Sequence, residues 1–294
     1  MALTLLAVLL VVAGSHALPD LARWRDFAWL RVWLAQGRRA PDGASRFPVV
    51  ALPLLLVVLC ALIQFALEHV LFGLPAFAFA VLVLFYAWGP RDLDADIDAV
   101  LKAPDSERRN AAAQALRPDA ASAPLPFEST PLVEAVFASA LSRWFGVLFW
   151  FVVMGPAGAL GYRVVQLLAR HPAFTAEIDA GQRPLLERCA LVLDWAPAHL
   201  LALTLALVSE FDTVVKTWRD YHAAHGKGYF TLDLGFLPVL AKAGIEADVI
   251  AGDGYASDVS DPLVELADAR TVLRRVLVAW LAVIALLALA GLMR

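Results

Sequence analysis

Ionisable side chains interrupt two long apolar stretches of the sequence. The stretch that begins RWFGVLFWFV carries Tyr162 and Arg163 near its end, and LVLDWAPAHLLALTLAL carries Asp194 and His199. A charge within a bilayer-crossing segment must reach the interface, pair with a partner or line a wet cavity. Two interpretations are therefore open for these side chains: contacts that hold helices together near the interface, or a functional polar cavity.

The depths of the two charges predict an ion pair. If the first stretch leaves the cytoplasm and the second returns to it, Arg163 lies about 7–8 Å of helical rise from the outer end, and Asp194 lies about 6 Å from that end. We predict that Arg163 and Asp194 pair within the membrane, with Tyr162 or His199 completing the hydrogen bonds, because an unpaired charge at this depth is costly.

Small residues recur in the centre of the first stretch. Gly155, Gly158 and Gly161 follow one another at three-residue spacing, and small side chains let membrane helices approach closely. Pro156 removes a backbone donor and bends a helix. The stretch is thus expected to be one bent span with a packing surface.

Two groups of residues offer ligands of the types that bind metals. Four aspartates alternate in RDLDADIDAV, but a calcium loop needs Gly at its sixth position and Glu at its twelfth, where this run has Ile97 and Ala103. A solvated helix after a membrane span fits this run better. The aspartates are Asp92, Asp94, Asp96 and Asp98.

The segment WRDYHAAHGKGYF contains Asp220, His222 and His225. Zinc-binding histidines on one helix face are usually four residues apart, and no third ligand is evident here. We interpret the segment as an aqueous-side helix that ends near Gly226. We predict no metal, no cofactor and no catalytic residue, since the chain has neither a P-loop nor a Gly-x-Ser-x-Gly motif.

The composition indicates a membrane protein. Of 294 residues, 61% are hydrophobic and 18% charged, whereas soluble domains are about 45–50% apolar and about 25% charged. A net charge of −4 without a basic run argues against nucleic-acid binding. Candidate spans, at roughly 20 residues each, are 2–18, 48–69, 74–89, 145–168, 190–209 and 272–292. The first and third of these are short.

The distribution of arginine predicts the orientation. The loops 19–47 and 90–144 carry most of the arginines, so both are expected in the cytoplasm together with 210–271, and 169–189 outside. The fold class is therefore an all-α, polytopic helical membrane protein with cytoplasmic helical segments. We divide the chain into three parts. Residues 1–89 hold the N-terminal spans with an interfacial amphipathic helix over 19–39, residues 90–130 hold a polar helical segment with a linker, and residues 131–294 form a second membrane region.

Four blocks of the second half resemble the CobD/CbiB family of membrane proteins. FGVLFWFVVMGPAGALGYRVV is similar to the family's P-L-F-W…G-G-x-x-G-A-L-x-Y-R block, and LDWAPAHLLAL to its N-W-I-P-A-R-L block. LDLGFLPVLAKAGIEAD places Asp233 and Gly235 at the positions of a conserved Asn and Gly in the family pattern, and DARTVLRRVL resembles the closing basic segment. The resemblance covers roughly residues 128–285, with the blocks in the family's order.

Two branches of that family differ in function. The adenosylcobinamide-phosphate synthase branch carries E-S-V-A-E-N-T-S-D before its P-L-F-W block. Here the first Glu is kept as Glu134, whereas the last five positions hold the residues ASALS of 138–142. The sequence therefore resembles the AmpE branch, whose members are regulatory.

The resemblance implies an inner-membrane regulatory or sensor protein of bacteria that acts in β-lactamase induction and cell-wall recycling. It implies the lipid bilayer as surroundings, and a muropeptide-recycling amidase or a cell-wall-derived ligand as partner. The alternatives are a synthase-like membrane enzyme and a small-molecule transporter. The candidate ligand-binding or polar-cavity residues are Glu134, Tyr162, Arg163, Asp194, His199 and Asp233.

Overall fold

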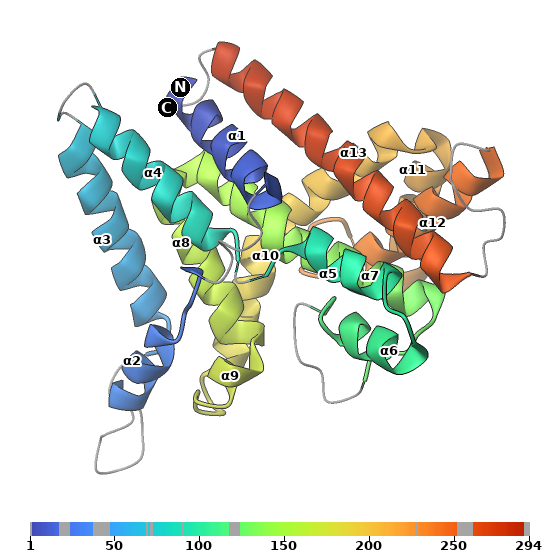
Figure 1. Ribbon diagram of the computed structural model, residues 1–294, viewed down its shortest axis with the longest axis horizontal. Helices are drawn as coiled ribbons and strands as arrows, with labels where there is room; N and C mark the ends of the chain where they lie inside the picture. The colour runs from blue at the N-terminus through green and yellow to red at the C-terminus, as the bar shows by residue number, and fades with distance from the viewer. Residues whose placement is uncertain are drawn as a thin grey trace. The chain divides into compact units, whose positions relative to one another are not determined.

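The computed structural model describes residues 2–17, 24–37, 48–68, 70, 73–89, 91–117, 124–226, 228–251 and 261–290, and it has helices but no strand in them (Figure 1). The predicted all-α class is confirmed. The helices are α1 (Ala2–Ala17), α2 (Trp29–Gly37), α3 (Ala51–Glu68), α4 (Leu74–Ala87), α5 (Leu93–Leu101), α6 (Ser106–Gln114), α7 (Ser129–Ala140), the π-helix η3 (Leu141–Phe145), α8 (Gly146–Arg170), α9 (Pro172–Thr175), α10 (Arg183–Val208), α11 (Phe211–His225), α12 (Phe236–Ala251) and α13 (Pro262–Leu289).

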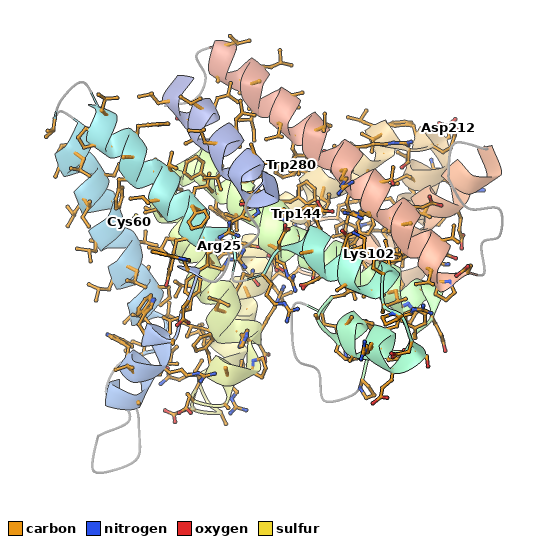
Figure 2. All side chains as sticks on the ribbon, in the orientation of Figure 1. Arg25, Cys60, Lys102, Trp144, Asp212 and Trp280 are labelled. Atoms are coloured by element: carbon orange, nitrogen blue, oxygen red, sulfur yellow. The ribbon has the colours of Figure 1, made fainter. Side chains whose placement is uncertain are left out.

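Within the described residues, four helical segments are long and apolar enough to cross a membrane: Ala51–Glu68, Ser129–Arg170, Arg183–Val208 and Pro262–Leu289. Two further apolar helices, Leu3–Ser15 and Leu74–Ala87, are shorter. A row of apolar side chains on α3 is more than half exposed, as expected of a surface that lipid covers (Figure 2). These residues are Leu54, Leu55, Val58, Leu59, Leu62 and Phe65.

The chain forms two compact units that interleave in sequence. The first unit comprises Met1–Asp92, Gly146–Leu193 and Val283–Arg294, and the second comprises Leu93–Phe145 and Asp194–Ala282. Helices α10 and α13 each contribute residues to both units. Each unit is described below by itself.

In the first unit, α8 packs against α3 and α4, and α1 packs against α4. At one end of the unit, Phe27 and Leu30 share a core cluster with Leu52 of α3, Leu168 of α8 and Phe174 of α9. Helix α2 thus buries an apolar face against protein, although Trp29 and Val32 of the same helix remain exposed.

Helix α8 reverses direction at Gly155, where the backbone leaves the helical conformation with φ of 68° and ψ of −157°. A Cβ atom added to Gly158 would lie 2.3 Å from the carbonyl oxygen of Trp150, and one added to Gly146 would lie 2.1 Å from the Tyr162 hydroxyl. In a straight helix, residues eight apart are separated by about 12 Å of rise. The two halves of α8, 146–154 and 156–170, therefore fold back on each other.

The reversal explains the sequence Gly-Pro-Ala-Gly in physical terms. Glycine adopts a positive φ without steric cost and commonly ends a helix. Proline is favoured in the first turn of a new helix, where its missing N–H is no loss. Gly155 thus ends the first half and Pro156 begins the second, so the expectation of one bent span was wrong.

A contact at the end of the first unit also corrects the predicted orientation. The backbone N–H of Val49 donates to Oε1 of Gln182 at 2.6 Å, and α2 packs against α9. Residues 24–37, 48–50 and 171–182 therefore lie at the same end of this unit. The sequence-based arrangement, with 19–47 inside and 169–189 outside, was wrong because a helical hairpin returns the chain to the side from which it came.

In the second unit, α12 packs against α7 and α11, and α5 packs against α6 and α7. Lys242 of α12 binds the buried Glu265 of α13 at 3.0 Å and Glu246 at 3.2 Å. Burial alone would lower the pKa of Lys242, but its hydrogen bonds to Glu265 and Glu246 outweigh burial and raise that pKa. The pair with Glu265 ties α12 to α13, whereas Glu246 lies on α12 itself.

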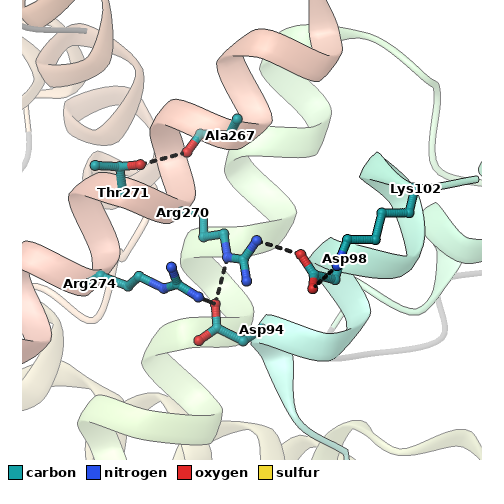
Figure 3. Close-up of polar contacts among 7 residues, drawn as sticks. All are labelled: Asp94, Asp98, Lys102, Ala267, Arg270, Thr271 and Arg274. Atoms are coloured by element: carbon teal, nitrogen blue, oxygen red, sulfur yellow. Dashed lines mark hydrogen bonds and ion pairs between the residues drawn. The ribbon is translucent and has the colours of Figure 1, made fainter. Parts of the chain in front are cut away.

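The alternating aspartates of α5 are not all solvated, contrary to the interpretation from sequence. Asp94 and Asp96 are each 5% exposed. Arg270 of α13 binds Oδ1 of Asp94 at 2.9 Å and Oδ1 of Asp98 at 2.5 Å, as Figure 3 shows. Arg274 reaches the same Asp94 oxygen at 3.2 Å. Alternation along a helix spreads the carboxylates around it, so two of them meet α13.

The remaining buried aspartate faces the π-helix. Nη1 of Arg143 in η3 binds Oδ2 of Asp96 at 2.7 Å, and Nη2 donates to the carbonyl oxygen of Ala115 at 2.9 Å. A π-helix is a rare local widening of the helical turn. It lies where the chain passes from α7 to α8, and it turns a cationic side chain toward α5.

Candidate functional site

Histidine and aromatic side chains from three helices and one loop gather in the second unit. We call this group the histidine–aromatic cluster. It draws on α10, α11, the segment 228–235 and the start of α12. Its members are Trp195, His199, Trp218, Tyr221, His222, Tyr229, Phe230 and Phe236, and ring centroids of neighbouring members are 4.3–6.1 Å apart.

His222 is held in one tautomer. Its Nε2 accepts a hydrogen bond from the indole Nε1–H of Trp218 at 3.0 Å, one helical turn earlier on α11. An indole nitrogen can only donate, so the neutral ring carries its proton on Nδ1. That Nδ1 is buried and has no hydrogen-bond partner among the described residues, and His222 is 6% exposed. The cluster therefore holds an unsatisfied donor, which is costly unless an acceptor meets it.

His199 faces two backbone acceptors. Its Nδ1 lies 2.7 Å from the carbonyl oxygen of Trp195, and its Nε2 lies 3.1 Å from that of Tyr229. A carbonyl only accepts, so a neutral ring can donate to one of these oxygens, whereas the doubly protonated ring donates to both. His199 thereby links α10 to the segment that follows α11.

Asp233 shapes the loop that enters α12. Its Oδ1 accepts the backbone N–H of Gly235 at 3.0 Å, and its Oδ2 accepts the hydroxyl of Tyr221 at 3.2 Å. The first bond is an Asx turn, typical of a segment that starts a helix. A Cβ on Gly235 would lie 2.3 Å from the Tyr221 hydroxyl, so glycine is required for this approach.

One edge of the cluster is open. The Phe230 side chain is 89% exposed and Tyr229 is 43% exposed, and the ring of Phe230 stacks near Trp195 at 6.1 Å. Aromatic rings with polar edges at an exposed site are typical of surfaces that bind ligands with apolar faces and hydrogen-bonding groups. Among the described residues, no group of three or more His, Cys, Asp or Glu side chains is arranged to hold a metal ion.

Arg163 has a different setting, in the first unit. Its Nε donates to the carbonyl oxygen of Ala87 at 2.6 Å and its Nη2 to that of Trp88 at 3.1 Å. Arg25 reaches the next carbonyl, Gly89, at 3.3 Å, and the Ser15 hydroxyl at 2.7 Å. The carbonyls that end a helix lack partners within it and carry partial negative charge. Two buried arginines therefore cap the end of α4.

Arg25 is completely enclosed, and Figure 2 labels it. Its guanidinium lies 4.3 Å above the ring of Phe85, a cation–π contact. Burial lowers the pKa of Arg25, and the charge of Asp92 partly opposes that change. From the sequence, Arg25 was expected only as part of the interfacial helix over 19–39.

Three other predicted residues are Tyr162, Asp194 and Glu134. Tyr162 is buried and packs against Gly146 across the reversal of α8, in the first unit. Asp194 is completely buried in α10, in the second unit, and its pairing with Arg163 stays a prediction. Glu134 is exposed on α7 and has no hydrogen bond or ion pair among the described residues. Of the six predicted residues, the cluster contains His199 and holds Asp233 at its margin.

The aromatic members of the cluster were not predicted from the sequence. His222 was weighed there as a zinc ligand, without a connection to Trp218. The signal was present as spacing, because Trp218 and His222 are four residues apart and therefore neighbours on one face of a helix. The contribution of Tyr229 and Phe230 depends on the loop conformation, which no periodic pattern specifies.

Comparison with known proteins places the chain in a family. No curated protein and no solved structure matches it. The family described as regulatory signalling modulator protein AmpE matches residues 3–293, nearly the whole chain, including both units and the histidine–aromatic cluster. The chain belongs to the AmpE family of regulatory signalling modulator proteins.

Proposed function

We propose that this chain is a multi-pass protein of the bacterial inner membrane that takes part in the control of β-lactamase induction. The family description supports a regulatory role, and the apolar helices support a membrane location. The likeness of the GPAGALGYR and LDWAPAHL blocks to CobD/CbiB proteins supports a shared ancestry with that family.

The proposed input is a cell-wall-derived ligand that binds at the histidine–aromatic cluster. One observation carries this assignment: the exposed ring of Tyr229 adjoins buried His222, whose Nδ1 donor is unsatisfied, and the exposed ring of Phe230 stacks near Trp195 of the same cluster. A sugar ring has apolar faces that stack on aromatic rings, and its hydroxyl, carbonyl and carboxylate substituents accept hydrogen bonds. Muropeptides combine these groups. The proposed partner is a muropeptide-recycling amidase.

The test is induction of β-lactamase in a strain that lacks this chain but keeps an inducible β-lactamase. Reintroducing the natural chain should restore induction by a sublethal β-lactam. Phe230→Ala, which removes a ring that is 89% exposed and therefore adds little to folding, should fail to restore it. Phe211→Ala is the matched control, because Phe211 is 53% exposed on α11 and makes no ring contact in the cluster.

Direct binding gives a second measurement. A purified anhydro-muropeptide should change the tryptophan fluorescence of the detergent-solubilised protein, and the Trp218→Phe variant should show a smaller change. Induction that is unaltered when the chain is deleted refutes the regulatory proposal. Normal induction with Phe230→Ala, together with unchanged fluorescence, refutes the ligand site alone.

A further inference from the structure

An apolar groove lies in the first unit, where α3, α8 and the beginning of α10 meet. Its volume is about 400 Å³, within the roughly 300–1,000 Å³ of small-molecule pockets. Apolar side chains form nearly all of its walls, among them Pro53 of α3, Met154 of α8 and Val192 of α10. The groove plays no part in the histidine–aromatic cluster.

The reversal of α8 creates this groove. Gly158 and Gly161 line it and contribute no side chain. A Cβ on Gly161 would lie 2.4 Å from Cγ2 of Val57, so the backbone of α8 approaches α3 as closely as glycine permits. Tyr162 is the neighbouring wall and is fixed against Gly146.

The groove is open to the surroundings of the membrane helices. Leu54 and Val192 line it and are 60% and 54% exposed. Both belong to segments that are long and apolar enough to cross a membrane. The hydrocarbon of the bilayer therefore has direct access to the groove.

A single charge accompanies these apolar walls. Arg188 is the only charged residue among the described residues that line the groove, and it is exposed. In the described part of the chain it has no hydrogen bond or ion pair, and the adjacent Glu187 does not line the groove. Arg188 lies five residues after the start of α10, about 7–8 Å along the helix.

That position corresponds to the headgroup level. Gln182, just before α10, contacts Val49, just before α3, so both helices begin at one end of the unit. An arginine within the first turns of a membrane helix extends its guanidinium to the interface. A cation at this level attracts the phosphate of a lipid headgroup.

We propose that the groove binds an anionic phospholipid, with one acyl chain along the apolar walls and the phosphate at Arg188. The apolar walls accept an acyl chain of any phospholipid. Arg188 supplies the preference for a net negative headgroup, because a zwitterionic lipid offers a compensating positive charge beside its phosphate.

Native mass spectrometry of the full chain in detergent micelles tests the proposal. The probes are phosphatidylglycerol and phosphatidylcholine with identical acyl chains. The natural chain should bind the first about five-fold more tightly, which corresponds to the roughly 1 kcal/mol contributed by one basic side chain near an anionic surface. Arg188→Gln should remove this preference. The control Arg183→Gln should keep it, since Arg183 lies on the same helix but does not line the groove.

A second pair of variants tests the acyl-chain site. Val192→Trp fills the groove and should weaken binding of both lipids, whereas Val153→Trp, at an exposed α8 position outside the lining, should not. Equal affinity of the natural chain for the two lipids would overturn the proposal, and so would identical behaviour of Arg188→Gln and Arg183→Gln. If Val192→Trp fails to fold, the arginine pair still decides the question.

Discussion

Removing one partner of the Arg143–Asp96 ion pair should lower the free energy of unfolding strongly, because both side chains are buried and the remaining charge would lose this partner. Their atoms are 2.7 Å apart, and the side chains are 11% and 6% exposed. Removing one partner of a buried pair costs about 3–5 kcal/mol. Arg143→Met also removes the hydrogen bond to Ala115, worth about 1 kcal/mol. Asp96 makes further contacts, so we expect a total loss near the lower limit, about 3 kcal/mol.

A surface pair at the end of α5 provides the control. Lys102 binds Asp98 at 2.7 Å, the same distance, but its side chain is 75% exposed. Solvent screening and lost side-chain entropy limit such pairs to about 0–1 kcal/mol. Lys102→Met should therefore change stability little. The two pairs match in distance and in formal charge, so burial is the main difference between them, beside the additional hydrogen bond from Arg143 to Ala115.

The assay is thermal unfolding in detergent, followed by tryptophan fluorescence at a fixed scan rate. Trp144 is buried next to Arg143 in sequence and reports on this region. At about 2–4 °C per kcal/mol, Arg143→Met should lower the midpoint by about 6–12 °C. The double variant Asp96→Asn/Arg143→Met should lose less than the sum of the single variants. A midpoint for Arg143→Met within 2 °C, roughly the effect of a surface pair, of that for Lys102→Met would refute the reasoning.

Four other predictions follow from the structure. Single cysteines at the exposed residues Ala35 and Ala180, in a background without Cys60 and Cys189, should respond alike to a membrane-impermeant thiol reagent in intact cells; opposite responses would restore the six-span arrangement. The hydrogen bond from Lys102 lowers the pKa of Asp98 below its ordinary value of 3.8; burial opposes this change, and Arg270 adds to it. The stability that the charged Asp98 contributes is therefore present above pH 3.8 and is lost as the pH falls through the lower pKa of the folded state. Unfolding midpoints of the natural chain and Asp98→Asn should therefore converge only in acid. Gly158→Ala should destabilise by about 1–3 kcal/mol, measured as a lower melting midpoint, whereas Gly181→Ala, where added atoms meet open space, should not. The chain should not complement a strain lacking adenosylcobinamide-phosphate synthase, since 138–142 lacks the synthase polar residues; growth that depends on corrinoid salvage would contradict this.

Hydrophobic runs were sufficient to locate most of the apolar helices. The expected spans 48–69 and 74–89 match α3 and α4 closely, whereas α10 begins seven residues before the expected span 190–209. Runs of this length have few alternatives, since backbone groups in lipid must be satisfied within a helix. An apolar run does not show whether the chain continues in one direction or turns back within the run. Both halves of α8 are apolar, and only the pair Gly155–Pro156 distinguishes a hairpin from a bend.

The candidate site was harder to predict because it depends on loops and on contacts between distant segments. His199 was identified as a polar residue in an apolar helix, yet its partner is the carbonyl of Tyr229. For the acidic run of α5, buried carboxylates were predicted to be solvated. Its pattern fits a solvated helix, but Arg143 and Arg270, far away in sequence, bury two of its carboxylates. One-dimensional patterns contain no information about such partners.

The reversal at Gly155 also constrains how the chain enters the membrane during synthesis. The helix that follows the reversal comprises residues 156–170, with a rise of about 22 Å, and does not reach across a hydrocarbon core of about 30 Å by itself. It therefore cannot leave the translocon as an independent stop-transfer segment. Helices α3 and α4, which pack against α8, emerge from the ribosome first. The hairpin thus inserts against neighbours that are already in the bilayer, and the order of the helices in the gene becomes part of the assembly pathway.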